Sequence, residues 1–123
     1  MELNLDTGEG QYHIRAYDVG FVQVNDKKID HSLIVTPNKL INPWAPQSLA
    51  ELDATHFLPL FDLKPTIVLL GTGPHFSFPT SALLTDFYTK KMGIEVMTTA
   101  AACRTYTVLA AEGRKVAAAL LMR

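Results

Sequence analysis

Hydrophobic and polar positions change their spacing along the chain, and in the N-terminal third apolar residues recur at every second position. One such stretch sets Tyr12, Ile14 and Ala16 against His13, Arg15 and Tyr17. A period of two residues is typical of a half-buried strand. Further runs cover residues 21–24 and 28–35, and the Asn-Asp-Lys link between them suits a tight hairpin. This third is predicted to be an antiparallel meander, preceded over residues 1–10 by a loose arm or a short edge strand.

The segment from residue 40 to residue 63 carries several competing signals. Ser48 begins a sequence that matches a capping box, but Asp53 or Thr55 could equally cap a helix that runs to about Leu63. Pro59 would lie inside that helix and should kink or shorten it. The three caps stay open at this point.

The second half alternates between strands and helices. Residues 66–70 form a continuous apolar run, which indicates a strand covered on both faces. Strands are also predicted at 94–97 and 115–122. A helix is predicted from Ser81 to Met92, capped by Thr80, and a second from Thr98 or Thr99 to near Glu112. The apolar face of the first helix comprises Leu83, Leu84, Phe87, Tyr88 and Met92.

This order of elements predicts an α/β fold. The N-terminal meander is followed by a βαβαβ unit, whose crossovers are right-handed and lay helices against a mostly parallel sheet. The strands at 66–70 and 94–97 should therefore be adjacent and parallel. With 123 residues, the chain has the usual size of one domain, so residues 1–123 are expected to form a single one.

Composition excludes several classes of protein. A formal net charge of −1 gives no reason to expect nucleic acid as a partner. A single cysteine excludes an internal disulfide, and with an acidic N-terminus it favours a cytoplasmic location. The strongly apolar runs are too short for membrane insertion.

Two loops form the leading candidate for a binding site. In parallel sheets, ligands bind beyond the carboxyl ends of strands, where helix N-termini point outward. Gly71, Thr72, Gly73 and His75 follow the first predicted parallel strand, and Thr98 and Thr99 follow the second. Glycines leave backbone N–H groups accessible, and the start of a helix attracts a carboxylate or phosphate. A small anionic ligand in a cleft between these loops is one hypothesis, and glycines that merely turn the chain are the other.

Arg104 lies in the second turn of the last predicted helix, and its side chain should lean back toward the helix start. A cation there opposes the helix dipole, so an anion or a carboxylate of the chain is expected beside it. Both partners stay open.

The remaining candidate residues indicate no chemistry. Cys103 lies among alanines with no neighbouring histidine, so a buried structural thiol is favoured over a nucleophile. The four histidines are scattered without ligand spacing, and we predict neither a metal nor a cofactor. No catalytic residues are assigned.

Several short motifs resemble one family. They are Leu69-Leu70-Gly71-Thr72-Gly73, Glu95-Val96-Met97-Thr98-Thr99, Ala102-Cys103-Arg104-Thr105-Tyr106, Val108-Leu109 and the run from Glu112 to Leu120. In these motifs the chain resembles the small domains of unknown function related to the adipogenesis-associated Mth-type domain protein and to mitochondrial complex I assembly factor three. The likeness covers about residues 64–121. Thr107 departs from it, since relatives often carry Asn there.

The resemblance implies a three-layer α/β fold with a mixed central sheet and an additional β layer. It carries over no catalytic residues, because the family has no established reaction. It favours a non-catalytic binding or assembly module with a protein partner, and a homo-oligomer stays open. The alternative is an enzyme or anion binder that uses the cleft between the two loops.

Overall fold

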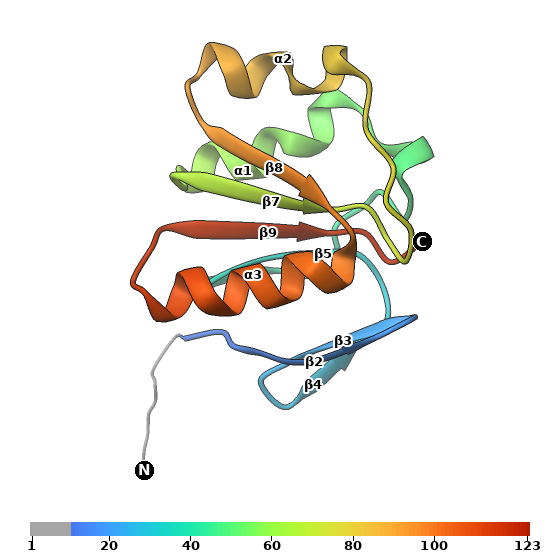
Figure 1. The fold of residues 1–123 in the computed structure, drawn as a ribbon, viewed down its shortest axis with the longest axis vertical. Coiled ribbons are helices and arrows are strands. Elements are labelled where there is room, and N and C mark those ends of the chain that lie inside the picture. Colours follow the sequence, from blue (N-terminus) through green and yellow to red (C-terminus); the bar gives the residue numbers. More distant parts are fainter. Residues whose placement is uncertain (1–10) are drawn as a thin grey trace.

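The computed structural model describes residues 11–123 (Figure 1). The arm or edge strand expected over residues 1–10 lies outside the described residues. The described residues form two sheets, one of three strands and one of five.

The small sheet confirms the predicted antiparallel meander. It consists of β2 (Ile14–Asp18), β3 (Phe21–Val24) and β4 (Lys27–Ile29), in that order. Asn25 has a positive φ of 52° in the turn between β3 and β4. Asn readily adopts this left-handed conformation, which is why the hairpin closes here.

The alternation predicted for β2 is interrupted by a bulge. Ile14 pairs with Val24 and Ala16 with Gln23, so Arg15 has no partner in the register. An extra residue shifts every later side chain by one position. Tyr17 therefore packs on the core together with Ile14, and Ala16, which the sequence placed on that face, is exposed.

The large sheet has the order β6-β5-β9-β7-β8. Its strands are β5 (Leu33–Thr36), β6 (Lys39–Ile41), β7 (Ile67–Gly71), β8 (Gly93–Met97) and β9 (Val116–Leu120). β7 pairs in parallel with both β8 and β9, whereas β5 pairs antiparallel with β6 and β9. This confirms the prediction that the strands near 66–70 and 94–97 are parallel neighbours, and it makes the sheet mixed.

One predicted strand, over residues 28–35, is wrong. The chain leaves the small sheet after β4 and enters the large one at β5. The break is fixed at Ser32, whose carbonyl accepts from Trp44 N–H at 2.8 Å and whose N–H donates to Gln47 Oε1 at 3.3 Å. Polar residues Asp30, His31 and Ser32 stand at this break, and the apolar residues on either side of it, Ile29 and Leu33, pack in the same core.

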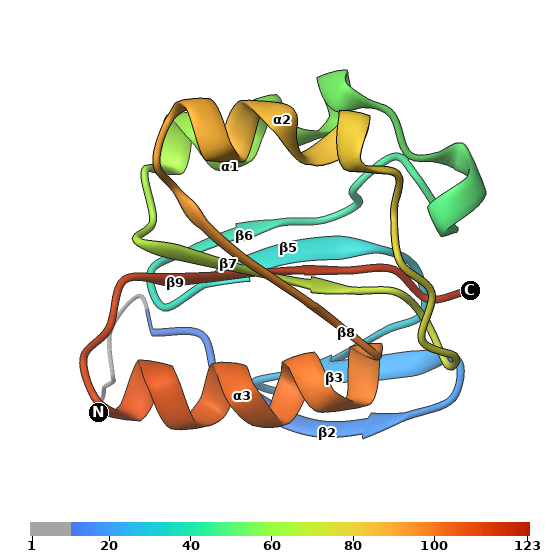
Figure 2. The ribbon, with the colours of Figure 1, turned by 45° about the horizontal axis from the view of Figure 1, so that its top comes forward.

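The helices complete a three-layer arrangement (Figure 2). On one face of the large sheet lie α1 (Leu58–Leu63) and α2 (Ser81–Thr89). On the other face lie α3 (Thr99–Ala111) and the small sheet. Two 3-10 turns, η1 (Leu49–Glu51) and η2 (Ala54–Phe57), lead into α1.

Of the three candidate caps before α1, Asp53 is the residue that makes capping bonds. Its carboxylate accepts from Thr55 N–H at 2.8 Å, and His56 Nδ1 accepts from Asp53 N–H at 3.0 Å. Ser48 precedes η1 but makes no capping bond. Pro59 stands in the first turn of α1, where a missing N–H costs nothing, so the helix begins there and is not kinked.

The helix predicted over residues 81–92 is shorter than expected. α2 ends at Thr89, and Lys91 takes a left-handed φ of 56°. The Lys90 ammonium lies 5.3 Å from the centroid of the Phe61 ring of α1, a cation–π contact. Tyr88, predicted on the buried face, is 63% exposed, while Leu84 and Phe87 of that face are buried.

The core lies on both faces of the large sheet, and small residues form its central strand. Alternate residues of β9 face opposite layers, with Ala117 and Ala119 toward α1 and α2 and Ala118 toward α3. Trp44 is 3% exposed and packs in the first of these layers. Its Nε1 donates to His56 O at 3.0 Å, so its polar edge is satisfied.

A long-range hydrogen bond ties α3 to the irregular segment that precedes β2. The Tyr106 hydroxyl donates to Tyr12 O at 2.8 Å, across 94 positions of sequence. The Tyr106 ring is 1% exposed, and burial raises the pKa of its hydroxyl. The hydroxyl therefore stays protonated and remains a donor.

Replacing Tyr106 by Phe should lower the free energy of unfolding by about 1 to 2 kcal/mol, because the Tyr12 carbonyl loses its partner while the ring still packs. Chemical denaturation measures this loss. The control is Tyr88→Phe, whose exposed hydroxyl should contribute almost nothing. Equal losses in the two variants would contradict the assigned role of the bond.

Candidate functional site

The loop after β7 and the start of α3 meet as predicted, and their polar groups bond to each other. Gly73 N–H donates to Thr99 Oγ1 at 2.8 Å, and Thr99 N–H donates to Gly73 O at 3.0 Å. The Thr99 hydroxyl, fully buried, donates in turn to Leu121 O at 2.6 Å. One side chain thus joins β7, α3 and the segment after β9.

The two glycines of this loop are required by close packing. A Cβ on Gly71 would lie 2.8 Å from Thr99 Oγ1 and 2.9 Å from Thr99 Cα. Gly73 has a φ of 97°, and a Cβ there would lie 2.5 Å from the backbone of Arg123. The glycines therefore let the helix start and the C-terminal residues approach the loop.

Thr72 and Thr98 of the predicted cleft also have partners within the chain. Thr72 Oγ1 donates to His75 O at 2.8 Å, and Thr98 Oγ1 accepts from Ala101 N–H at 3.2 Å, which makes Thr98 the cap of α3. The His75 side chain is exposed. An anion between these loops stays a prediction, but it would compete with the bonds of Gly73 and Thr99.

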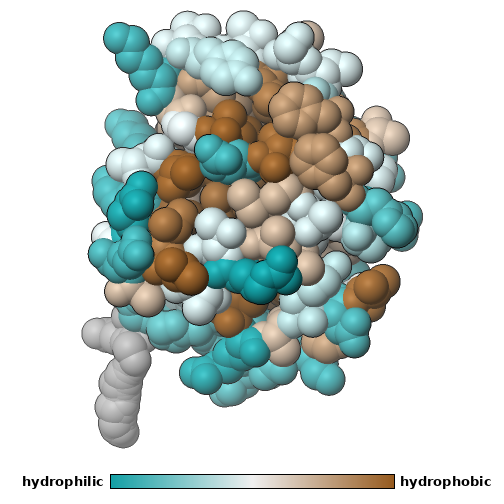
Figure 3. Space-filling model, viewed as in Figure 1, coloured by the Kyte–Doolittle hydropathy of each residue, from teal (hydrophilic) through white to brown (hydrophobic). Residues whose placement is uncertain are grey.

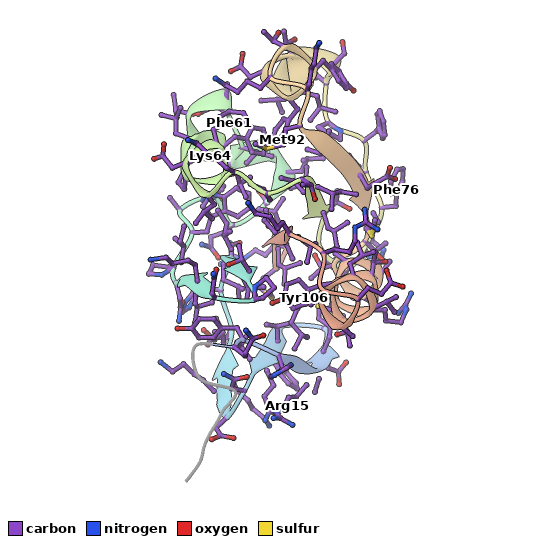
Figure 4. The ribbon with its side chains drawn as sticks, turned by 90° about the vertical axis from the view of Figure 1, so that its left-hand side faces the viewer. Arg15, Phe61, Lys64, Phe76, Met92 and Tyr106 are labelled. Carbon is purple, nitrogen blue, oxygen red and sulfur yellow. The ribbon has the colours of Figure 1, made fainter. Side chains whose placement is uncertain are left out.

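Arg104 lies in a different place from the glycine loop. It lines an open groove of about 460 Å³ between α3 and β2, and that groove's lining contains no residue of the loop at 71–73. The lining residues are Ile14, Arg15, Ala16, Tyr17, Ala100, Cys103, Arg104 and Thr107. Figure 4 shows Arg15 on the small sheet beneath α3. Arg15 was not singled out in the sequence, where nothing connects it with a residue 89 positions away.

The groove holds two neutral groups that can donate hydrogen bonds. Burial raises the pKa of the Cys103 thiol to about 12, and the nearby Arg104 only partly opposes this. Burial also raises the pKa of the Tyr17 hydroxyl, followed by the effects of Cys103 and Asp18. Neither group is ionised near neutral pH, so the groove suits binding and offers no thiolate nucleophile.

A second cavity, of about 280 Å³, lies near the opposite end of α3. Arg114 and Lys115 line it together with Ala110, Gly113 and residues around Thr36. The carbonyls at the end of a helix carry partial negative charge, which already complements these two cations.

The edge of the large sheet carries an apolar surface. β8 is the last strand of that sheet, and the loop beside it exposes Phe76 (55%) and Phe78 (69%), with ring centroids 6.0 Å apart. Figure 4 shows Phe76 beside the β8 ribbon, and Figure 3 shows apolar side chains gathered on this face. We name β8, Phe76 and Phe78 the edge surface. The sequence signal that could have indicated this surface is a pair of aromatic residues, Phe76 and Phe78, in a loop without helical or strand periodicity.

The backbone of β8 alternates between its partner and solvent. Gly93 N–H donates to Thr66 O, and Met97 O accepts from Thr72 N–H, so the odd-numbered residues face β7. The N–H and C=O groups of Ile94 and Val96 consequently point away from the sheet. No other described residue hydrogen bonds to these four groups.

The described chain offers no metal site and no membrane span. Within residues 11–123, no three side chains of His, Cys, Asp or Glu come together as a metal would require. None of the helices in that range has the length and apolar character needed to cross a bilayer.

A family model described as a protein of unknown function (DUF498/DUF598) matches residues 14–121. The chain belongs to this family. The resemblance carried by residues 64–121 is thereby confirmed, and the family match also covers the N-terminal strands. A relative from Drosophila melanogaster, NADH dehydrogenase [ubiquinone] 1 alpha subcomplex assembly factor 3, is 29% identical over 119 residues. That match covers 94% of this chain but only 57% of the relative.

Solved structures of the family share the fold. The NMR structure of a Xanthomonas campestris protein is 39% identical, with a TM-score of 0.85, and the match covers 99% of this chain and 92% of that one. A Bordetella pertussis protein described as a Mth938-like domain is 26% identical, with a TM-score of 0.81 and coverage of 98% and 92%. The three-layer α/β fold expected from the resemblance is thus confirmed.

Replacing Thr99 by Val should lower the free energy of unfolding by about 2 to 4 kcal/mol, because Gly73 N–H and Leu121 C=O are left buried without partners. Thr99→Ser keeps the hydroxyl and should cost only about 1 kcal/mol for the lost methyl group. Thr107→Val, on the exposed side of the same helix, serves as the control in denaturation measurements. A Val variant as stable as the Ser variant would contradict the bonding scheme.

Cys103 should react slowly with iodoacetamide in the folded protein. With a pKa near 12 instead of 9.0, its thiolate population near pH 8 is about a thousandfold below that of an ordinary cysteine. Mass spectrometry of timed samples, with urea-unfolded protein as the control, measures the rate. Cys103→Ala should fold with only a modest loss of stability. Alkylation as fast in the folded as in the unfolded protein would refute the buried thiol.

Proposed function

We propose that this chain is a non-catalytic binding module, of the kind that assembly factors provide, and that an extended segment of a partner protein binds along β8. The observation that carries the proposal is the edge surface. It combines an unpaired strand edge with two exposed aromatic rings.

An exposed edge strand favours the addition of another strand. The outward N–H and C=O groups of Ile94 and Val96 match the hydrogen-bonding pattern of a further strand. Proteins usually block such edges with lysine, proline or a covering loop. β8 contains no lysine or proline, and its single charged residue is Glu95. The edge is therefore open to a partner, and Phe76 and Phe78 add apolar contact area beside it.

Glu95 determines the chemistry of the partner. Because its backbone groups face β7, an antiparallel strand added outside would place a residue opposite it in a non-hydrogen-bonded pair, where side chains approach closely. A lysine or arginine is favoured there. Apolar residues are favoured opposite Ile94 and Val96, which lie half-buried on either side.

The same position argues against a second copy of this chain as the occupant. Two β8 strands that overlap fully in antiparallel register bring Glu95 opposite Glu95 of the other copy. Like charges directly opposite are destabilising. A segment of another protein with a basic residue at that position avoids this repulsion, so we commit to it.

The relatives support a protein partner and no more. The Drosophila melanogaster relative is named as an assembly factor, and this chain matches 57% of its length. No triad, metal cluster or ionised nucleophile among the described residues supports catalysis. The single cysteine supports a cytoplasmic location for this chain as part of the same proposal.

A small anion held between the loop at 71–73 and Thr98-Thr99 is the second candidate, and the geometry supports it less. The Gly73 N–H and the Thr99 hydroxyl, which would have to meet the ligand, already bond to each other. Arg104 lines a different groove.

A photoreactive benzoylphenylalanine in place of Phe76 should crosslink to one partner segment in living cells, and the same residue in place of Val108 on α3 is the matched control. The crosslinked segment, made as a peptide, should protect the amides of Ile94 and Val96 from hydrogen exchange when it binds the purified protein. The amides of Gly93 and Glu95 face β7 and should change little. Glu95→Lys should weaken the peptide at least about tenfold, since attraction becomes repulsion.

Three results would overturn the proposal. The first is equal crosslinking from Phe76 and Val108. The second is a peptide that binds without protecting Ile94 and Val96. The third is crosslinking to another copy of the same chain together with a dimer in sedimentation measurements.

A further inference from the structure

We infer that the groove between α3 and β2 is a binding site for a phosphoryl group carried on a small organic molecule, held between Arg15 and Arg104. This site is separate from the edge surface, and it involves neither the glycine loop nor β8. It therefore goes beyond the proposed function and does not depend on it.

Arg15 stands at the bulge in β2, beside the groove. In a regular strand, neighbouring residues point to opposite faces, yet Ile14, Arg15, Ala16 and Tyr17 all line this one groove. Arg15 is the residue without a partner in the register between β2 and β3. Bulges re-aim side chains and are enriched next to binding sites.

The two guanidinium groups lack a counterion among the described residues. The ion pairs within residues 11–123 are those of His31 with Asp30 and His56 with Asp53, so neither arginine takes part in one. Asp18, the acid that acts on Tyr17, does not line the groove. Two cations from different elements line this one groove, which favours an anion there over a further cation.

The rest of the groove adds to its preference for an anion. Ala100, in the first turn of α3, brings the positive end of the helix to the same groove. The Tyr17 hydroxyl stays protonated and can donate a hydrogen bond. No carboxylate lines the groove.

The size and lining of the groove specify the ligand further. Each guanidinium offers a fork of two N–H donors, and together with a hydroxyl they exceed what the two oxygens of a carboxylate can accept. A phosphoryl group has three free oxygens and more charge. The volume of about 460 Å³ is far larger than a bare ion needs. Ile14, Ala16 and Ala100 provide apolar contacts for the organic part.

The test is an NMR titration of the full chain with phenyl phosphate, inorganic phosphate and benzoate, all at one ionic strength. Phenyl phosphate should shift the Nε–H signals of Arg15 and Arg104 and the amide of Ala100. Inorganic phosphate should bind at the same place but more weakly, and benzoate more weakly than phenyl phosphate. Arg15→Met and Arg104→Met should each weaken phenyl phosphate at least about tenfold, the effect of losing a charge-assisted pair.

Two further variants keep the test decisive. Arg114→Met removes a cation from the other cavity and should leave the affinity unchanged. Arg104→Lys keeps the charge but loses the fork, so it should bind with intermediate affinity even if Arg104→Met fails to fold. Equal weakening by Arg114→Met would reduce the effect to overall charge and overturn the site. So would shifts confined to other residues, or benzoate binding as tightly as phenyl phosphate.

Discussion

The buried hydroxyl of Thr99 is the interaction on which the rest of this structure depends. It accepts from Gly73 and donates to Leu121, so it fixes the start of α3 against the ends of β7 and β9 at once. Both candidate surfaces follow from that junction. The direction in which α3 leaves it determines the groove shared with β2, and the direction in which the loop leaves Gly73 carries Phe76 to the edge of β8.

Sequence patterns predicted the parts of the fold that are decided locally or by general topology. The apolar run at 66–70 and the helix after it were enough to predict a parallel neighbour near 94–97. The sequence patterns gave wrong predictions where contacts between residues far apart in the chain determine the structure. Residues 28–35 were predicted as one strand, but they belong to two sheets that share a core, and the break at Ser32 is held by bonds from Trp44 and to Gln47. The bulge at Arg15 left no trace in the alternation of side chains.

The meeting of the two loops could be predicted from the sequence, but the bonds between them could not. The rule for parallel strands correctly brought Gly71, Gly73 and Thr99 together, yet these groups satisfy one another, which only the distances reveal. For Arg104 the sequence indicated a missing negative partner, and among the described residues that partner is still missing. The presence of Arg15 in the same groove could not be foreseen, because the groove forms only when the small sheet packs beside α3.

The alanines of β9 have a consequence for how substitutions in the core can alter the surface. Three alanines stand in β9, between the two core layers. Because their side chains are small, the helices on both faces pack close to the sheet. Ala118 lies beneath α3, and a larger residue there would lift the helix away from the sheet. Because α3 forms one wall of the groove with Arg15 and Arg104, the width of that groove is adjustable from the interior, without any change to the residues that line it.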